Sequence, residues 1–205
     1  MNNIQQLVVM VTRVITRDKD EKIKLIYKSF SRLVNSEGYE KVTTRKIAED
    51  AGISIGIIYH YFTEGKPEIA AGFWEESLNV MMDPIFVLKG SDEDVKREIT
   101  LHLENHRKNE AMYRAFDQAI LEKKDLFEGL KRSRAELIET KIRANFTEIS
   151  SPAQLSELVE KYLRVYGLVD ALVHRHLFQA PFAKSDEELV HILSDLSLSI
   201  LGKEK

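Results

Sequence analysis

Apolar side chains recur every three or four residues along most of this chain, and no stretch alternates strictly between apolar and polar positions as a half-buried strand does. The pattern predicts an all-α fold. The first clear helix is expected over residues 18–36, because Gly38 follows it as a helix terminator. One face of that helix is apolar and consists of Ile23, Ile26, Tyr27, Phe30, Leu33 and Val34.

Two short helices and six longer segments are expected after it. Thr43 or Thr44 can cap the first short helix, which ends near Ala51, and Ser54 can cap the second, which reaches about Phe62. Breaks that contain proline or glycine divide the rest of the chain. The expected longer segments are approximately 67–82, 92–109, 111–123, 126–148, 153–178 and 186–201. We therefore predict a small three-helix domain at residues 18–66 and a larger helical domain at residues 67–205.

Residues 1–17 form an N-terminal extension, expected to add an amphipathic turn or strand or to arise from an early start codon, since Met10 could also initiate. Its apolar run at residues 7–11 is too short to cross a membrane, and the basic start and small-residue cleavage site of a secretory signal are missing. The chain has no cysteine, which excludes disulfides and thiolate metal sites and fits a cytoplasmic protein. Hydrophobic residues at 43% and charged residues at 31% are typical of a folded protein rather than a disordered one.

Charge is unevenly distributed along the chain. Residues 17–66 carry ten Lys and Arg against eight Asp and Glu, a net charge of +2, whereas residues 67–205 carry nineteen against twenty-five, a net charge of −6. Contacts to phosphate supply the sequence-independent part of an affinity for DNA. The asymmetry agrees with a basic DNA-binding segment attached to an acidic one, but it identifies no function by itself.

The segment TTRKIAEDAGISIGIIYHYF at residues 43–62 has the spacing of a helix-turn-helix. Ala48 is small where two helices cross closely, Gly52 suits a turn with positive φ, and Ile58 can fix the second helix onto the first. Ile47, Ala51 and Ile53 fill the other inward positions. An ordinary helical hairpin could share any one of these features, but the capped set after an amphipathic helix favours DNA binding.

From about residue 18 to residue 74 the chain resembles the DNA-binding domain of TetR-type transcriptional regulators. The matching residues are Gly38-Tyr39, Thr43-Thr44-Arg45-Lys46-Ile47-Ala48, Ala51-Gly52-Ile53-Ser54, Gly56 and Tyr59-His60-Tyr61-Phe62. The resemblance implies a dimeric repressor that a small molecule releases from DNA. The rest of the chain typically diverges in this family, so the resemblance says little about the effector.

The resemblance also implies which residues meet DNA. They are Thr44, Arg45, Ser54, Ile55, Gly56, Ile57, Tyr59, His60, Tyr61 and Lys66. Isoleucine cannot donate a hydrogen bond to a base edge but can pack on thymine methyl groups, so Arg45 is expected to be the main hydrogen-bonding reader. The alternative for Tyr61 is packing between the small domain and the larger domain. The same alternative is weaker for Tyr59. The family usually has lysine where this chain has Gly65, which leaves Lys66 to reach phosphate from one position later.

Two apolar helix faces in the larger domain predict a dimer interface, which the resemblance also implies. The alternative is that these faces cover the core of a single chain. The residues assigned to the interface are Leu158, Tyr162, Tyr166, Val169, Leu172, Leu193, Leu196 and Ile200.

A pocket for a small hydrophobic effector is expected in the same domain, because methionine and aromatic side chains suit an adaptable apolar site, although they suit an ordinary core equally well. The residues assigned to it are Trp74, Met82, Phe86, His102, His106, Met112, Tyr113, Phe116, Asp117 and Ile120. His102 and His106 stand four residues apart, as metal ligands on a helix do. Because no carboxylate or cysteine stands near them at ligand spacing, we expect no metal site and no cofactor.

The leading hypothesis is a TetR-type repressor that binds a palindromic operator as a homodimer, is released by the effector and has no membrane association. An effector-independent DNA-binding factor is one alternative. A helical protein-interaction module that has lost DNA binding is another, because Ile55 and Ile57 make the groove-facing edge apolar. The sequence contains no catalytic motif such as a Gly-rich phosphate loop or a Gly-x-Ser-x-Gly elbow, so we predict no enzyme activity and no catalytic residues.

Overall fold

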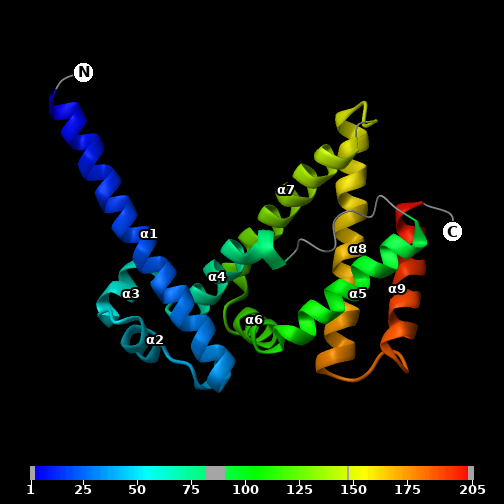
Figure 1. The fold of residues 1–205 in the computed structure, drawn as a ribbon, viewed down its shortest axis with the longest axis horizontal. Coiled ribbons are helices and arrows are strands. Elements are labelled where there is room, and N and C mark those ends of the chain that lie inside the picture. Colours follow the sequence, from blue (N-terminus) through cyan, green and yellow to red (C-terminus); the bar gives the residue numbers. More distant parts are fainter. Residues whose placement is uncertain (1–2, 82–90, 147, 203–205) are drawn as a thin grey trace. The chain divides into compact units, whose positions relative to one another are not determined.

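The computed structural model describes residues 3–81, 91–146 and 148–202, and all regular structure in these ranges is helical. The all-α fold expected from the periodicity is confirmed. The helices are α1 (Asn3–Glu37), α2 (Thr44–Ala51), α3 (Ile55–Tyr61), α4 (Lys66–Met81), α5 (Asp92–Lys108), α6 (Glu110–Glu122), α7 (Glu128–Asn145), α8 (Pro152–Phe178) and α9 (Asp186–Leu201), with 3-10 turns η1 (Tyr39–Lys41) and η3 (Lys124–Phe127) (Figure 1).

Two expected helices differ in extent from the structure. The first helix begins at Asn3 instead of residue 18, so the N-terminal extension is neither a turn nor a strand. Residues 3–37 contain no proline or glycine, and nothing in that segment stops the helix. The segment expected at 126–148 is shorter, because η3 precedes α7 and the helix runs from Glu128 to Asn145.

The chain divides into two compact units. The first, here called the head, contains residues 1–73 and 115–126, and the second, called the body, contains residues 74–114 and 127–205. The boundaries between the units fall within α4, within α6 and within η3. The head therefore includes residues 115–126 from the middle of the chain.

The head is built on the second half of α1, against which α2 and η1 pack and beside which α3 also lies (Figure 1). Ile26, Phe30 and Val34 on α1 are completely buried, as the periodicity predicted. The Phe30 ring meets the rings of Tyr39 and Phe73 at centroid distances of 6.3 and 5.8 Å. Full burial of such side chains contributes roughly 1.5–3 kcal/mol each, so this core fixes the frame on which α2 and α3 are held.

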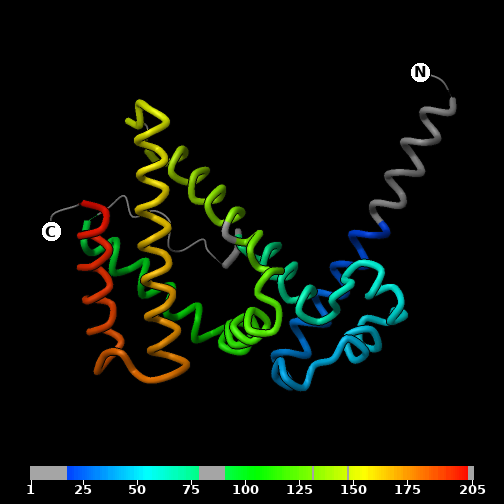
Figure 2. Tube along the Cα trace, turned by 180° about the vertical axis from the view of Figure 1, so that it is seen from behind, coloured from blue at the N-terminus to red at the C-terminus, as the bar shows by residue number. Residues whose placement is uncertain are grey.

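The body consists mainly of α5, α7, α8 and α9, with α8 in contact with each of the other three and α5 also against α9. Figure 2 shows α8 and α9 lying side by side. Their contact surfaces are apolar, with Val169, Val173, Leu189 and Leu193 at most 1% exposed. Within the described ranges, every helix is too short or too polar to span a membrane.

Candidate nucleic-acid interface

The turn between α2 and α3 has the geometry of a helix-turn-helix. Thr43 caps α2 by accepting a hydrogen bond from the Lys46 N–H at 3.2 Å. Gly52 ends the helix in the left-handed region with φ 67°, and the Ile53 N–H donates back to the Ala48 carbonyl at 3.0 Å. The positive φ expected of Gly52 is therefore confirmed, and it turns the chain within a few residues.

Helix α3 begins at a second cap and is held to α2 by its inner face. The Ser54 side chain accepts a hydrogen bond from the Ile57 N–H at 3.4 Å, as the sequence predicted. Ile58 is completely buried, and Ile47 and Ala48 on α2 are at most 3% exposed. These inward positions leave the opposite side of α3 facing away from the core.

Two ion pairs orient α2 against α1. Arg32 on α1 pairs with Asp50, and the Lys46 ammonium lies 2.5 Å from a Glu37 carboxylate oxygen. The hydrogen bond from Arg32 holds the pKa of the Asp50 carboxyl below its ordinary value. Exposed ion pairs of this kind stabilise the folded state by only about 0–1 kcal/mol each. The pair with Glu37 holds the Lys46 side chain against α1, so Arg45 is the cation of α2 that faces solvent.

Apart from Lys66, the residues assigned to DNA are exposed or half-buried, and they are here called the presented surface. Arg45, Ser54, Gly56 and His60 are exposed, and Arg45 makes no hydrogen bond or ion pair with any described residue. Ile55 and Tyr59 are 39% and 46% exposed, so an apolar and an aromatic side chain of α3 are open to contact with another molecule. Thr44, Ile57 and Tyr61 are half-buried at its edges. A basic side chain, two helix starts and exposed apolar groups on one side suit the major groove.

Comparisons with known proteins agree with this geometry. The family model described as "Bacterial regulatory proteins, tetR family" matches residues 26–71. That segment contains the second half of α1, the helix-turn-helix and the start of α4. Residues 26–71 of the head therefore match a TetR-family DNA-binding domain.

Solved structures extend the likeness to the fold of the chain as a whole. A TetR transcriptional regulator from Rhodococcus sp. RHA1 matches with a TM-score of 0.64 at 14% identity, over 88% of this chain and 98% of that one. The fatty acid degradation regulator FadR from Bacillus halodurans matches with a TM-score of 0.56 at 18% identity, over 86% and 94%. No protein with a curated description matches the sequence. At these identities the structural likeness shows a shared fold.

Lys66 is placed differently from the other residues assigned to DNA in the head. Its ammonium lies 3.7 Å from the centre of the Tyr39 ring, 3.3 Å from the Tyr39 carbonyl oxygen and 3.5 Å from a Glu122 carboxylate oxygen. The side chain is only 15% exposed. The shifted lysine therefore joins α4 to η1 and α6 inside the head, and we leave it out of the interface proposed below.

The residues assigned to the effector pocket separate into three groups. Trp74, His102, His106, Met112 and Tyr113 lie in the body and are all buried. Phe116, Asp117 and Ile120 are half-buried in the segment of α6 that belongs to the head, and Met82 and Phe86 lie outside the described residues. The first group is continuous, because Tyr113 stacks on His106 at 3.6 Å and meets Trp74 at 5.1 Å between ring centroids.

The structure adds two residues of α8 to this group. Asp170 lies next to the His102 and His106 rings, and His174 follows it one turn later. No carboxylate stands near the two histidines at ligand spacing in the sequence, but the fold brings Asp170 to them from another helix. The signal was present in the sequence, because Asp170 and His174 repeat the four-residue spacing of His102 and His106.

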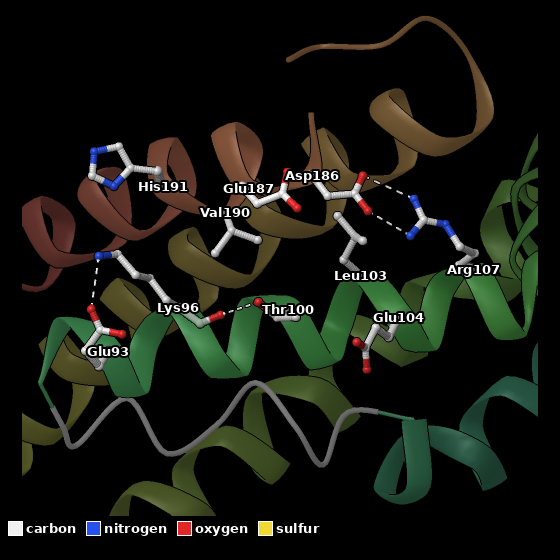
Figure 3. A pocket seen from close by; sticks show the side chains of 10 residues that line it. All are labelled: Glu93, Lys96, Thr100, Leu103, Glu104, Arg107, Asp186, Glu187, Val190 and His191. Carbon is white, nitrogen blue, oxygen red and sulfur yellow. Dashed lines mark hydrogen bonds and ion pairs between the residues drawn. The ribbon is translucent and has the colours of Figure 1, made fainter. Parts of the chain in front are cut away.

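A groove with a volume of about 550 Å³ lies between α5 and α9 in the body (Figure 3). Arg107 donates two hydrogen bonds across it to Asp186, at 2.8 and 3.1 Å. Lys96, Glu93, Glu104 and other polar residues line most of its length. This charged groove differs in character from the apolar pocket that the sequence predicted, and it contains none of the residues assigned to that pocket.

The residues assigned to a dimer interface divide by burial. Tyr162, Tyr166, Val169 and Leu193 are at most 6% exposed in the single chain, where they already contact its own core. Leu158, Leu172 and Ile200 are half-buried, and Leu196 is 40% exposed. Only this second set is free to meet another molecule.

Proposed function

We propose that this chain is a cytoplasmic transcriptional repressor that binds a palindromic operator as a homodimer and leaves it when a small apolar effector binds. The observation that carries the proposal is the presented surface of the head, where Arg45 has no ion-pair or hydrogen-bond partner among the described residues and the start of α3 is exposed. If Arg45 were ion-paired and the start of α3 were buried, the helix-turn-helix could not contact bases.

The roles of the presented residues follow from their chemistry. Arg45 donates to guanine O6 and N7 or to phosphate, and Ile55 packs on a thymine methyl group. Tyr59 and His60 donate to phosphate oxygens beside the groove. The N-terminal N–H groups of α2 and α3 favour the same anions. Base preference then depends on one hydrogen-bonding side chain and one methyl contact per half-site. Two such contacts give a single half-site little sequence specificity.

Dimerisation supplies the remaining specificity. A single helix-turn-helix contacts one half-site, and two half-sites with centres about 34–36 Å apart are contacted by a symmetric pair. Leu158, Leu172, Leu196 and Ile200 of the body are the available part of the apolar faces of α8 and α9. We assign the homodimer contact to these four residues.

Effector release requires a ligand that binds one conformation of the dimer better than the other. The buried aromatic group around Trp74 and Tyr113 is the candidate site, because its lining is apolar and lies wholly in the body. The similar Bacillus halodurans protein is described as a regulator of fatty acid degradation, which makes acyl compounds a sensible first class to screen. We propose no enzymatic activity.

The test begins with selection of bound duplexes from a random pool, because the operator is unidentified. An enriched palindrome protected by the purified chain, with half-sites one helical turn apart, supports the proposal. Arg45→Ala should weaken binding to that palindrome by at least tenfold, since a good arginine–guanine contact is worth about 1–3 kcal/mol. Arg164→Ala is the matched control, because Arg164 is an exposed arginine of α8 paired only with Glu160 among the described residues.

Each outcome has one meaning. Equal binding by the wild-type and Arg45→Ala proteins would remove Arg45 from the interface. An enriched palindrome that no acyl compound displaces would favour the effector-independent factor. A pool without enrichment, at low as well as moderate salt, would contradict DNA binding and favour a protein-interaction module that uses the exposed Ile55 edge.

A further inference from the structure

The body contains a buried cluster of nitrogen and oxygen ligands contributed by two helices in contact. Helix α5 supplies His102 and His106, and α8 supplies Asp170. The candidate ligand atoms of these three residues all lie within 4.8 Å of one another. His102 and His106 are 1% and 0% exposed, so these polar rings are fully removed from water.

The hydrogen bonding of His106 fixes which of its nitrogens carries the proton. Its Nδ1 lies 2.9 Å from the carbonyl oxygen of His102, and only a protonated nitrogen can donate to a carbonyl. The Nε2 atom is buried and has no hydrogen-bond partner among the described residues. It faces an Asp170 carboxylate oxygen at 3.3 Å. In the tautomer protonated at Nδ1 alone, both of these atoms are acceptors, and a metal ion between them would bind both.

His102 repeats the arrangement. Neither of its ring nitrogens has a hydrogen-bond partner among the described residues, and Nε2 lies 3.6 Å from the same Asp170 oxygen. The cluster therefore holds two buried imidazoles, each with an Nε2 atom that lacks a hydrogen-bond partner among the described residues, beside one carboxylate oxygen.

We propose that His102, His106 and Asp170 bind a divalent transition-metal ion. Metal bonds of about 2.0–2.2 Å at tetrahedral angles put ligand atoms roughly 3.4 Å apart, close to the 3.3 and 3.6 Å observed. Imidazole nitrogens with one carboxylate select zinc, iron, nickel or copper over calcium and magnesium, which need oxygen ligands. The inference goes beyond the proposed function, because it holds whether or not the chain binds DNA.

Neighbouring groups surround the site. His174 Nε2 lies 3.9 Å from the same carboxylate oxygen but is not one of the three residues whose ligand atoms all lie within 4.8 Å of one another. Tyr113 stacks on His106 with the rings inclined by 16°, and the Tyr166 hydroxyl donates to Asp170 at 3.4 Å. Contacts behind the ligands fix ring and carboxylate orientation in metal sites. The Asp170 side chain is 26% exposed, which gives an ion a way in.

The test uses the full chain after removal of metals by a chelator. Titration with Co²⁺ should give the visible absorption of a low-symmetry cobalt site and saturate at one ion per chain. Zn²⁺ should then displace the cobalt, and the melting temperature should rise with free Zn²⁺ as mass action requires. A titration without stoichiometric binding, or a cobalt spectrum like that of the aqueous ion, would overturn the proposal without any variant.

Two variants locate the site. Asp170→Asn and His106→Gln keep side-chain size and should weaken Zn²⁺ binding by about 100-fold or more, because each removes a ligand. His191→Gln is the matched control. His191 also lies near a carboxylate, with its Nε2 atom 4.0 Å from an Asp195 oxygen, but its side chain is exposed. Equal weakening in all three variants, or none in the first two, would place the ion elsewhere and contradict the proposal. Circular dichroism of the metal-free proteins shows whether each variant has folded.

Discussion

Gly65 occupies a position in the head where both the backbone and the space beside it require glycine. Its φ is 67°, in the left-handed region that other residues rarely adopt. A Cβ added there would lie 2.9 Å from the Thr44 hydroxyl oxygen and 3.4 Å from the Tyr59 ring. Both neighbours belong to the presented surface, so the connection after α3 sets the positions of residues proposed to meet DNA.

Gly65→Ala should therefore lower stability and DNA affinity together. We expect the free energy of unfolding to fall by about 1–3 kcal/mol, because the backbone is strained and Thr44 is displaced. In thermal unfolding the melting temperature should fall by roughly 2–4 °C for each kcal/mol. Gly52→Ala is the matched control, because Gly52 has the same φ of 67° but no atom within 4 Å of an added Cβ. It should cost only the backbone part, about 1 kcal/mol. Equal losses would mean that the contact with Thr44 has no effect.

The residues that the sequence predicted correctly are those whose role is local. Gly52 ends α2 with positive φ, Ile58 is buried, and Ser54 caps α3, each within a few residues of its partners. Asp170 stands 64 residues beyond His106, and its place beside that ring depends on how α5 packs on α8. Helical periodicity predicts that two faces are buried but not which polar residues on them meet.

At the scale of elements, α1 and α4 approach closely at Gly72. A Cβ added to Gly72 would contact the Tyr27 hydroxyl and lie 3.2 Å from the ring carbon that bears it. The Tyr27 ring is packed against Phe62 and Phe73 at centroid distances of 5.8 and 6.0 Å. It has little room to move, and the missing side chain at Gly72 sets the separation of the two helices.

Gly72→Ala should destabilise the head although alanine is the better helix former. Tyr27→Phe removes the hydroxyl that meets the new methyl group, so the double variant should lose less than the sum of the single losses in a thermal or chemical unfolding cycle. Gly167→Ala provides the contrast, because Gly167 lies within α8 with no atom within 4 Å of its added Cβ. That substitution should stabilise by about 0.5–1 kcal/mol. Additive losses in the cycle would show that Gly72 and Tyr27 do not contact in solution.

Element boundaries show what periodicity alone predicts and what it misses. The expected segment at 186–201 matches α9 exactly at both ends, because Ser185 caps it and Gly202 ends it with φ 70°. The start of α1 was missed by fifteen residues, since residues 3–17 lack a cap or breaker and their weak periodicity gave no reason to extend the helix. Strong start and stop chemistry predicts a boundary, whereas an uninterrupted segment leaves it open.

At the scale of the whole molecule, the proposed repressor depends on joining two copies. One head offers one arginine that is proposed to contact bases, so one copy alone would discriminate poorly between DNA sequences. Two linked heads bind the second half-site at a high effective concentration, which multiplies affinity without any new contact. The apolar side chains that α8 and α9 leave at the surface of the body would then matter for DNA binding although they never approach the DNA.

Leu196→Lys tests this link, because Leu196 is 40% exposed and can be charged without disturbing the core of one chain. We expect the variant to fold as the wild type does, to sediment as a monomer at micromolar concentration, and to bind a palindrome about 100-fold more weakly as the linkage is lost. Leu121→Lys is the control: Leu121 lies on α6 in the head, is 87% exposed, and should alter neither mass nor affinity. A Leu196→Lys protein that remains dimeric would place the interface on another surface. A monomeric variant with full operator affinity would show instead that one head suffices.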